Sequence, residues 1–184
     1  YKMKFQLKVY ERSFSKDNKE LRFLSADFKL NKSIIELLPG KSSNVDLRFI
    51  GKKVAIEKSY ILVISEIGSD NNEELRYLSQ IEASLYMGER NQRASLSLIN
   101  AVQIKNNLEL SFENIGTKHI KLKRYKVVLI QGKTKYNISF RSKEYSKLGE
   151  QIILPGVPRK IIIQGLSKFN PGKVAGKFHR LFRK

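Results

Sequence analysis

Few residue types in this chain could carry out catalysis. Histidine occurs only at His119 and His179, and cysteine is absent from all 184 residues. His119 stands beside a predicted turn with no Gly-x-Ser-x-Gly nucleophile motif in the chain, and His179 lies among basic residues with no carboxylate near it in sequence. Two isolated histidines do not provide the ligand spacing of a zinc site, and no glycine-rich phosphate loop occurs. The sequence therefore predicts no metal site, no cofactor and no enzymatic activity.

Paired carboxylates occur at two places, Glu73–Glu74 and Glu109 with Glu113. The first pair lies in a polar loop, where solvation explains it. The second pair brackets a predicted strand, and its spacing puts both side chains on one face. Repulsion there would raise the pKa of one carboxyl group, although exposed strand positions explain the pair equally well. Neither pair identifies an acid–base site.

The net charge is the most unusual feature of the composition. The chain has 36 Lys and Arg against 17 Asp and Glu, a formal charge of +19. Such a field favours an anionic partner, such as nucleic acid, lipopolysaccharide or an acidic membrane surface. Solvated lysines that keep the molecule soluble are the equally favoured alternative.

Nucleic-acid binding requires aromatic side chains beside the basic ones. Tyr125 and Tyr136 lie among lysines and could stack on bases. Strand alternation predicts that Phe49, Phe112 and Phe140 point inward, which leaves no clear aromatic platform. A basic module that binds nucleic acid or a cell-surface polyanion therefore remains the alternative function.

The elements that would position these residues are strands, because apolar and polar residues alternate with a period of two. No run of 18 or more apolar residues occurs. A polar, glycine-containing segment at 88–93 predicts a domain boundary, and the sequence Leu-Pro-Gly recurs at 38–40 and 154–156 before a strand. We expect an all-β protein of two tandem immunoglobulin-like β-sandwich domains, 1–88 and 92–166. The predicted strands are 5–10, 45–49, 59–65, 75–87, 94–99, 108–112, 120–130, 136–140 and 160–164.

Residues 167–184 are expected to form a separate basic tail. Its apolar residues Val174, Phe178, Leu181 and Phe182 fit one face of a helix, and most of the others near them are basic. Such a helix could lie on an anionic membrane surface. A frayed, cationic chain end is the favoured alternative.

Two stretches resemble the periplasmic chaperones of pilus (fimbrial) assembly by the chaperone–usher route. Residues 57–67, which read Glu-Lys-Ser-Tyr-Ile-Leu-Val-Ile-Ser-Glu-Ile, are similar to a strand of that family's first domain. A loop and a long edge strand at 75–87 follow, as they do in the family. Residues 110–120 resemble the Asn-x-Gly turn that opens the family's second domain, with Asn114 and Gly116 at the turn.

The resemblance implies a binding protein that works without ATP in the periplasm. Its partners would be pilin-like subunits, each lacking one strand of its sandwich, and an outer-membrane usher. The chaperone's edge strand would fill the gap in the subunit. On this reading the odd positions of the edge strand enter the subunit: Tyr77, Ser79, Ile81, Ala83 and Leu85.

The chain also departs from the family pattern. Members use two basic residues to hold the subunit's terminal carboxylate. One of them belongs to the family's first strand, which we expect either to lie upstream of Tyr1 or to be missing. The other lies late in the edge strand, where this chain has Ala83 and Ser84. No residue here inherits the role of carboxylate anchor.

Overall fold

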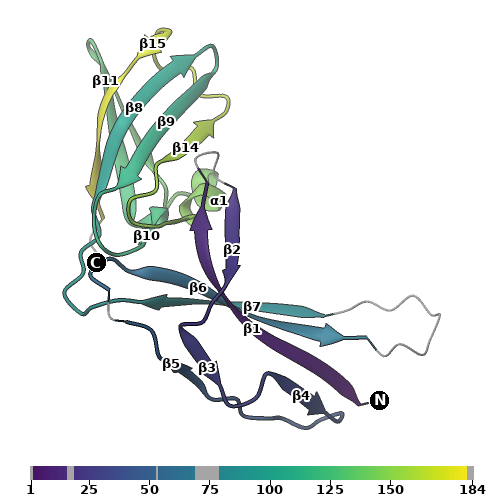
Figure 1. Ribbon diagram of the computed structural model, residues 1–184. Helices are drawn as coiled ribbons and strands as arrows, with labels where there is room; N and C mark the ends of the chain where they lie inside the picture. The colour runs from purple at the N-terminus through teal and green to yellow at the C-terminus, as the bar shows by residue number, and fades with distance from the viewer. Residues whose placement is uncertain (1, 16–18, 53, 69–78, 182–184) are drawn as a thin grey trace. The chain divides into compact units, whose positions relative to one another are not determined.

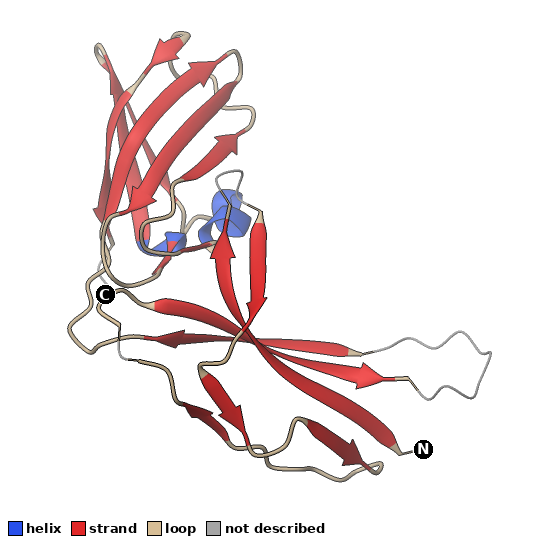
Figure 2. Ribbon diagram, in the orientation of Figure 1, coloured by secondary structure: helices blue, strands red, loops and turns tan. Residues whose placement is uncertain are grey.

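The computed structural model describes residues 2–15, 19–52, 54–68 and 79–181. The chain divides into two compact units (Figure 1). The first comprises Tyr1–Ser13, Glu20–Val54 and Lys58–Gly88, and the second comprises Phe14–Lys19, Ala55–Glu57 and Glu89–Lys184. Strands make up most of the described chain, and its helical segments are short (Figure 2).

The first unit is built on a sheet with the strand order β2–β1–β6–β7, in which β4 also pairs with β1. Strands β3 and β5 form a separate two-stranded antiparallel sheet. The strands of this unit are β1 (Met3–Phe14), β2 (Glu20–Leu24), β3 (Phe28–Leu30), β4 (Ile34–Leu37), β5 (Leu47–Phe49), β6 (Lys58–Ile67) and β7 (Gln80–Met87).

Tyr60 of β6 is the centre of the first unit's core and is fully buried. The rings of Phe28 and Phe49 meet it edge to face, with centroids 4.9 and 6.3 Å away. Such aromatic pairs add about 1 kcal/mol each to the effect of burial. The pair β3–β5 is thereby packed on the Tyr60 face of the sheet.

The second unit contains two larger sheets and one small one. Their strand orders are β14–β9–β8–β15, β12–β11–β16 and β10–β13. The elements are β8 (Leu96–Ile104), β9 (Asn107–Asn114), β10 (Ile120–Lys121), η1 (Leu122–Arg124), β11 (Tyr125–Gln131), β12 (Thr134–Ser139), η2 (Lys143–Tyr145), α1 (Ser146–Gly149), β13 (Ile152–Ile153), β14 (Arg159–Ile163), β15 (Gly172–Lys173) and β16 (Ala175–Arg180).

Alternate residues of β9 and β11 fill the core between the two larger sheets. Leu108, Leu110 and Phe112 are buried on β9, and Val127 and Leu129 are buried on β11. Burying a side chain of this size contributes about 2 kcal/mol. The inward direction predicted for Phe112 and Phe140 is confirmed, since neither has exposed surface.

Asn114 organises the turn that follows β9. It is fully buried, and its side-chain amide donates to the carbonyl oxygens of Lys118 and Ile153 at 2.8 and 3.1 Å. Its side-chain oxygen accepts the N–H of Gly116 at 3.1 Å. Gly116 has no space for a side chain, because a Cβ would lie 2.3 Å from the carbonyl oxygen of Arg93. The Asn-x-Gly sequence is thus explained by buried amide bonds and by close backbone packing.

The C-terminal segment differs from the sequence prediction. Residues 172–173 and 175–180 form β15 and β16, so the amphipathic helix and the frayed end expected there are both wrong. Strand β16 pairs with β11 along its length, from Tyr125↔Arg180 to Ile130↔Ala175. Phe178 is 7% exposed and contacts Phe112, with ring centroids 5.3 Å apart. The segment belongs to the core of the second unit.

Among the described residues, no helix is long and apolar enough to cross a membrane.

Candidate functional site

Strand β7 lies at the end of the first unit's sheet. It pairs with β6 in antiparallel register from Lys58↔Met87 to Ser65↔Gln80, and no other described strand pairs with it. Its second edge therefore presents backbone N–H and C=O groups that no described strand uses. Such an edge is a template for pairing with another chain.

The odd positions of β7 lie on the Tyr60 face of the sheet, because directly opposed residues share a face. Leu85 is opposite Tyr60, and Ala83 is opposite Leu62. Ile81, opposite Ile64, has 61% of its surface exposed. An isoleucine side chain that is this exposed gains little of the hydrophobic stabilisation that burial would provide.

The structure places four of the five residues predicted to contact a partner. Ser79 precedes β7 and is exposed, and Ile81 and Ala83 are exposed on the strand. Leu85 is half-buried near Tyr60, so part of its side chain already packs within its own unit. Tyr77 lies outside the described residues. The exposed apolar part of the predicted face is therefore centred on Ile81.

The even positions of β7 are bonded to their own unit. Both oxygens of Glu82 accept from the guanidinium of Arg22, at 2.5 Å from Nη1 and 2.9 Å from Nη2. Arg22 comes from β2, at the opposite end of the strand order, and its Nε also bonds Glu20 at 2.7 Å. This bidentate geometry is the strongest form of side-chain ion pair. It fixes β7 from its polar side.

The electrostatics of this pair follow from its geometry. The hydrogen bonds from Arg22 hold the pKa of Glu82 below its usual value. The same bonds, together with those to Glu20, raise the pKa of Arg22. Both side chains stay charged at neutral pH.

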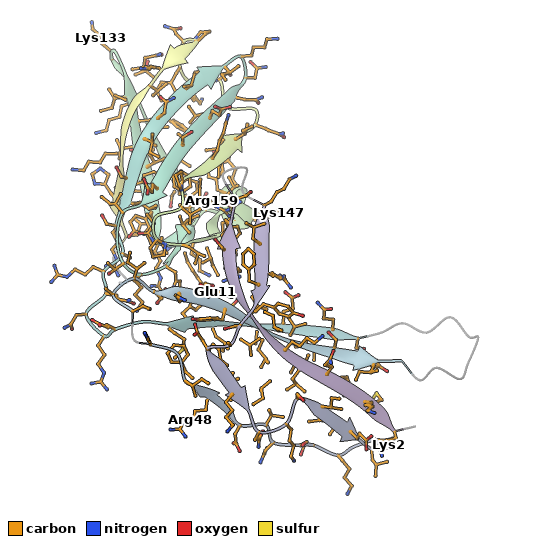
Figure 3. All side chains as sticks on the ribbon, viewed as in Figure 1. Lys2, Glu11, Arg48, Lys133, Lys147 and Arg159 are labelled. Atoms are coloured by element: carbon orange, nitrogen blue, oxygen red, sulfur yellow. The ribbon has the colours of Figure 1, made fainter. Side chains whose placement is uncertain are left out.

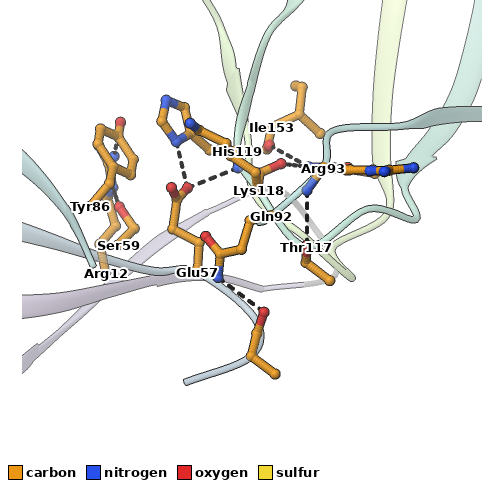
Figure 4. A network of polar contacts seen from close by, with 12 residues as sticks. Arg12, Glu57, Ser59, Tyr86, Gln92, Arg93, Thr117, Lys118, His119 and Ile153 are labelled. Atoms are coloured by element: carbon orange, nitrogen blue, oxygen red, sulfur yellow. Dashed lines mark hydrogen bonds and ion pairs between the residues drawn. The ribbon is translucent and has the colours of Figure 1, made fainter. Parts of the chain in front are cut away.

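A second polar link joins β1, β6 and β7 (Figure 4). The guanidinium of Arg12 donates to the hydroxyl of Tyr86 at 2.8 Å and to that of Ser59 at 3.0 Å. Sequence reasoning missed Arg12 and Arg22, since their partners lie 47 to 74 residues away. Their position on strands with alternating polar residues was the only available signal.

The buried hydroxyl of Tyr60 donates to a carboxylate oxygen of Asp27 at 2.5 Å. Burial is the main cause that raises the pKa of Tyr60, and the bond to Asp27 adds to it. The Nζ of Lys58 lies 3.6 Å from the same carboxylate oxygen. These contacts fix the β6 residue that lies opposite Leu85 in the strand register.

His119, the first of the two histidines considered for catalysis, is held by Glu57 (Figure 4). One carboxylate oxygen of Glu57 accepts the backbone N–H of His119 at 2.8 Å. The same oxygen lies 2.5 Å from Nδ1 of the His119 ring. The Glu57 side chain is only 6% exposed. The pair joins the residue before β6 to the residue before β10, and no motif in the sequence indicates it.

The other candidate groups are not brought together. His179 is exposed on β16. Glu109 forms an ion pair with Lys160 at 2.7 Å, and the Glu73–Glu74 pair lies outside the described residues. Within the described ranges, no three His, Cys, Asp or Glu side chains are placed to hold a metal ion.

No protein-family profile matches the sequence, and a search of curated proteins finds no match. Solved structures do match, over almost the whole chain. One is the class 5 fimbriae chaperone CfaA, with a TM-score of 0.60 and 13% identity over 100% of this chain and 87% of that one. Another is a chain from a chaperone–tip adhesin complex of CFA/I fimbriae biogenesis, with a TM-score of 0.61 and 12% identity over 98% and 85%.

A third match comes from the CsuC–CsuE pre-assembly complex of archaic chaperone–usher Csu pili of Acinetobacter baumannii. It has a TM-score of 0.57 and 13% identity over 95% of this chain and 84% of that one. At such low identity these matches establish the fold. The chain has the two-domain, immunoglobulin-like β-fold of fimbrial chaperones, and the fold class predicted from the sequence is confirmed.

Proposed function

We propose that this protein is an ATP-independent chaperone that binds pilus subunits by donating strand β7. The observation that carries the proposal is the state of β7: a strand at the sheet's end, unpaired on one side among the described residues, that exposes Ile81 on its apolar face. Strand addition uses these two properties together, since backbone bonds give affinity and alternate side chains enter pockets.

The two faces of β7 have different tasks in this mechanism. Glu82 and Tyr86 attach the strand to its own sheet through Arg22 and Arg12. A strand that is already extended and held loses less conformational entropy when a partner pairs with it. Ser79, Ile81 and Ala83 stay available to a subunit's groove, with Leu85 at the end of the row and Tyr77 proposed to extend it.

The comparisons support a pilus subunit as the partner. Two of the similar structures are described as complexes of a chaperone with a tip adhesin or tip adhesion subunit. We further propose that the protein acts in the periplasm, delivers its subunit to an outer-membrane usher, and binds without catalysing a reaction.

The test is co-purification with a pilus subunit co-expressed in the periplasm, using Ile81→Asp and the matched control Ser84→Asp. Both positions are exposed on β7, and they point to opposite faces. Ile81→Asp should weaken subunit binding at least about thirtyfold, because it removes about 2 kcal/mol of apolar burial and 1.4 kcal/mol corresponds to tenfold.

Ser84→Asp should bind within about threefold of wild type, since only contacts on the bonded face change. Leu85 is a poorer probe, because its replacement also disturbs packing near Tyr60. Equal binding by all three proteins, each shown by circular dichroism to be folded, would rule out β7 as the donor. Raising the salt concentration should leave the Ile81-dependent binding largely intact.

A further inference from the structure

The outward face of sheet β12–β11–β16 carries one lysine in each of three successive rows of paired residues. Strand register places Lys126 between Ser139 and His179, and Val128 between Asn137 and Lys177. The next row places Ile130 between Lys135 and Ala175. We call these nine residues the cationic sheet face. The alternating residues of the same strands, such as Val127, Leu129 and Phe178, are buried in the core.

This face lacks acidic residues by sequence as well as by structure. No Asp or Glu occurs in residues 114–143 or in residues 151–184, which together contain all three strands. Among the described residues, Lys126, Lys135 and Lys177 take part in no ion pair. Lysines elsewhere in the unit do, as Lys123 does with Glu150 and Lys160 with Glu109.

Further basic residues border the face. Lys133 projects from the tip of the β11–β12 turn (Figure 3), and Lys173 ends β15 just before β16. Like charges held close together on a sheet repel one another, and no described carboxylate relieves this repulsion on the face. An anionic surface that covers the lysines relieves this repulsion, which favours binding.

The chemistry of the face indicates which anionic surface fits. Its cations are lysines, which are compact point charges without the fork geometry of arginine. Ile130, 44% exposed, and the half-buried Val128 lie between the lysines. Tyr136 packs against the core, so the face offers no aromatic ring on which a base could stack. Lysines around an apolar centre on a sheet suit lipid headgroups, where each basic residue contributes about a fivefold increase in binding.

We propose that the cationic sheet face docks the protein on an anionic phospholipid bilayer. The docking is independent of strand donation, since its residues belong to the second unit and β7 belongs to the first.

The test is co-sedimentation of the full chain with phosphatidylcholine vesicles that contain or lack phosphatidylglycerol. Wild type should bind the anionic vesicles and should be released by salt. Lys126→Glu with Lys177→Glu should lower binding at least about thirtyfold. Loss of two lysines alone gives two factors of about five, and the two new negative charges weaken binding further. Lys135→Glu with Lys177→Glu is a second pair, in case the first does not fold.

The matched control is Lys41→Glu with Lys147→Glu. It changes the net charge by the same amount at two exposed positions outside the face, one in the first unit and one on α1. This control should keep most of the binding. An equal loss in the control, or equal binding to neutral vesicles, would show that no specific face is involved.

A third arm uses single-stranded DNA at the same salt concentration. Binding of DNA that depends on Lys126 and Lys177, with no binding to phosphatidylglycerol vesicles, would overturn the lipid assignment. Ile81→Asp should bind vesicles as wild type does, so failure of strand donation and failure of lipid docking give different results.

Discussion

Replacing Asn114 with alanine should destabilise the second unit by about 3 kcal/mol. The side chain is fully buried and donates to two carbonyl oxygens at 2.8 and 3.1 Å. It also accepts two backbone N–H groups, from Gly116 at 3.1 Å and from Ser95 at 3.4 Å. Each neutral hydrogen bond contributes about 1 kcal/mol net, and the longest one contributes least.

Unsatisfied backbone groups add to this loss of stability. Alanine leaves the carbonyl oxygens of Lys118 and Ile153 with one partner fewer in a dry environment, and such groups cost about 1 to 3 kcal/mol each when unpaired. Water could replace the amide only by entering the space that the side chain leaves.

Urea unfolding of the full chain, followed by far-ultraviolet circular dichroism, measures the loss. Hydrogen exchange of peptides from β9 and β10 assigns it to the second unit, because two units need not unfold together. Asn137→Ala is the control, as Asn137 is an exposed asparagine on β12. A loss under about 1 kcal/mol, or one equal to that of the control, would refute the account of the Asn-x-Gly turn.

Three further predictions concern other contacts. Glu82→Gln should cost the first unit under about 1 kcal/mol, because the pair with Arg22 is partly exposed. The folded pKa of Glu82 lies below its ordinary value, so this stabilisation is present above about pH 4.5 and is lost as the pH falls through the folded pKa. The stabilities of wild type and Glu82→Gln, measured by unfolding at decreasing pH, should therefore become equal in acid. Tyr60 should resist ionisation in an absorbance titration, and its contribution to stability, complete below pH 10, should be lost as the pH rises further; a full complement of tyrosines ionising near pH 10 in the folded protein would contradict its burial. Phe178→Ala should cost about 3 kcal/mol of stability in urea unfolding, as expected for an aromatic ring removed from a core, whereas a neutral effect would restore the picture of a frayed end.

Some strands of the second unit, such as β9, β12 and β14, could be predicted from the sequence because their alternation is regular. The single strand predicted at 120–130 is wrong, because η1 (Leu122–Arg124) separates β10 from β11. On β9, Leu108, Leu110 and Phe112 are buried, while Glu109 lies on the other face. A period of two over eight residues leaves one interpretation. The run of β-branched, leucine and aromatic residues at 59–65 also predicted β6, although burial there does not alternate: Ser59, Tyr60 and Ile61 are buried in succession.

Strand β16 could not be recognised, for a reason that the structure makes plain. Its inward positions follow Val174 and are Gly176 and Phe178, so the middle of the apolar row has no side chain. A Cβ at Gly176 would lie 2.6 Å from Leu129 and 2.9 Å from the carbonyl oxygen of Val128. Close packing thus requires glycine there. Because Gly176 contributes no apolar side chain, the sequence shows only Val174 and Phe178, whose spacing of four residues is typical of a helix.

Two side-chain pairs that join distant parts of the chain could not be predicted from the sequence either. Arg22 and Glu82 are 60 residues apart, and Glu57 and His119 are 62 apart. Neither pair forms a motif, because the two residues of each pair are too far apart in the sequence to be recognised as partners. Only the pairing of β1 with β6 and of β6 with β7 brings β2 and β7 into one sheet.

The distribution of charge gives the two proposed surfaces opposite responses to salt. On β7, Ile81 and Ala83 offer apolar area and backbone bonds, and the charge of Glu82 is already neutralised by Arg22. Screening removes little from such an interface. The cationic sheet face has no carboxylate of its own, so its affinity for anions should fall steeply as salt increases. If a single partner bound both surfaces, Ile81→Asp would weaken its binding, and so would Lys126→Glu with Lys177→Glu. Raising the salt concentration would then remove only the part of the binding that depends on Lys126 and Lys177.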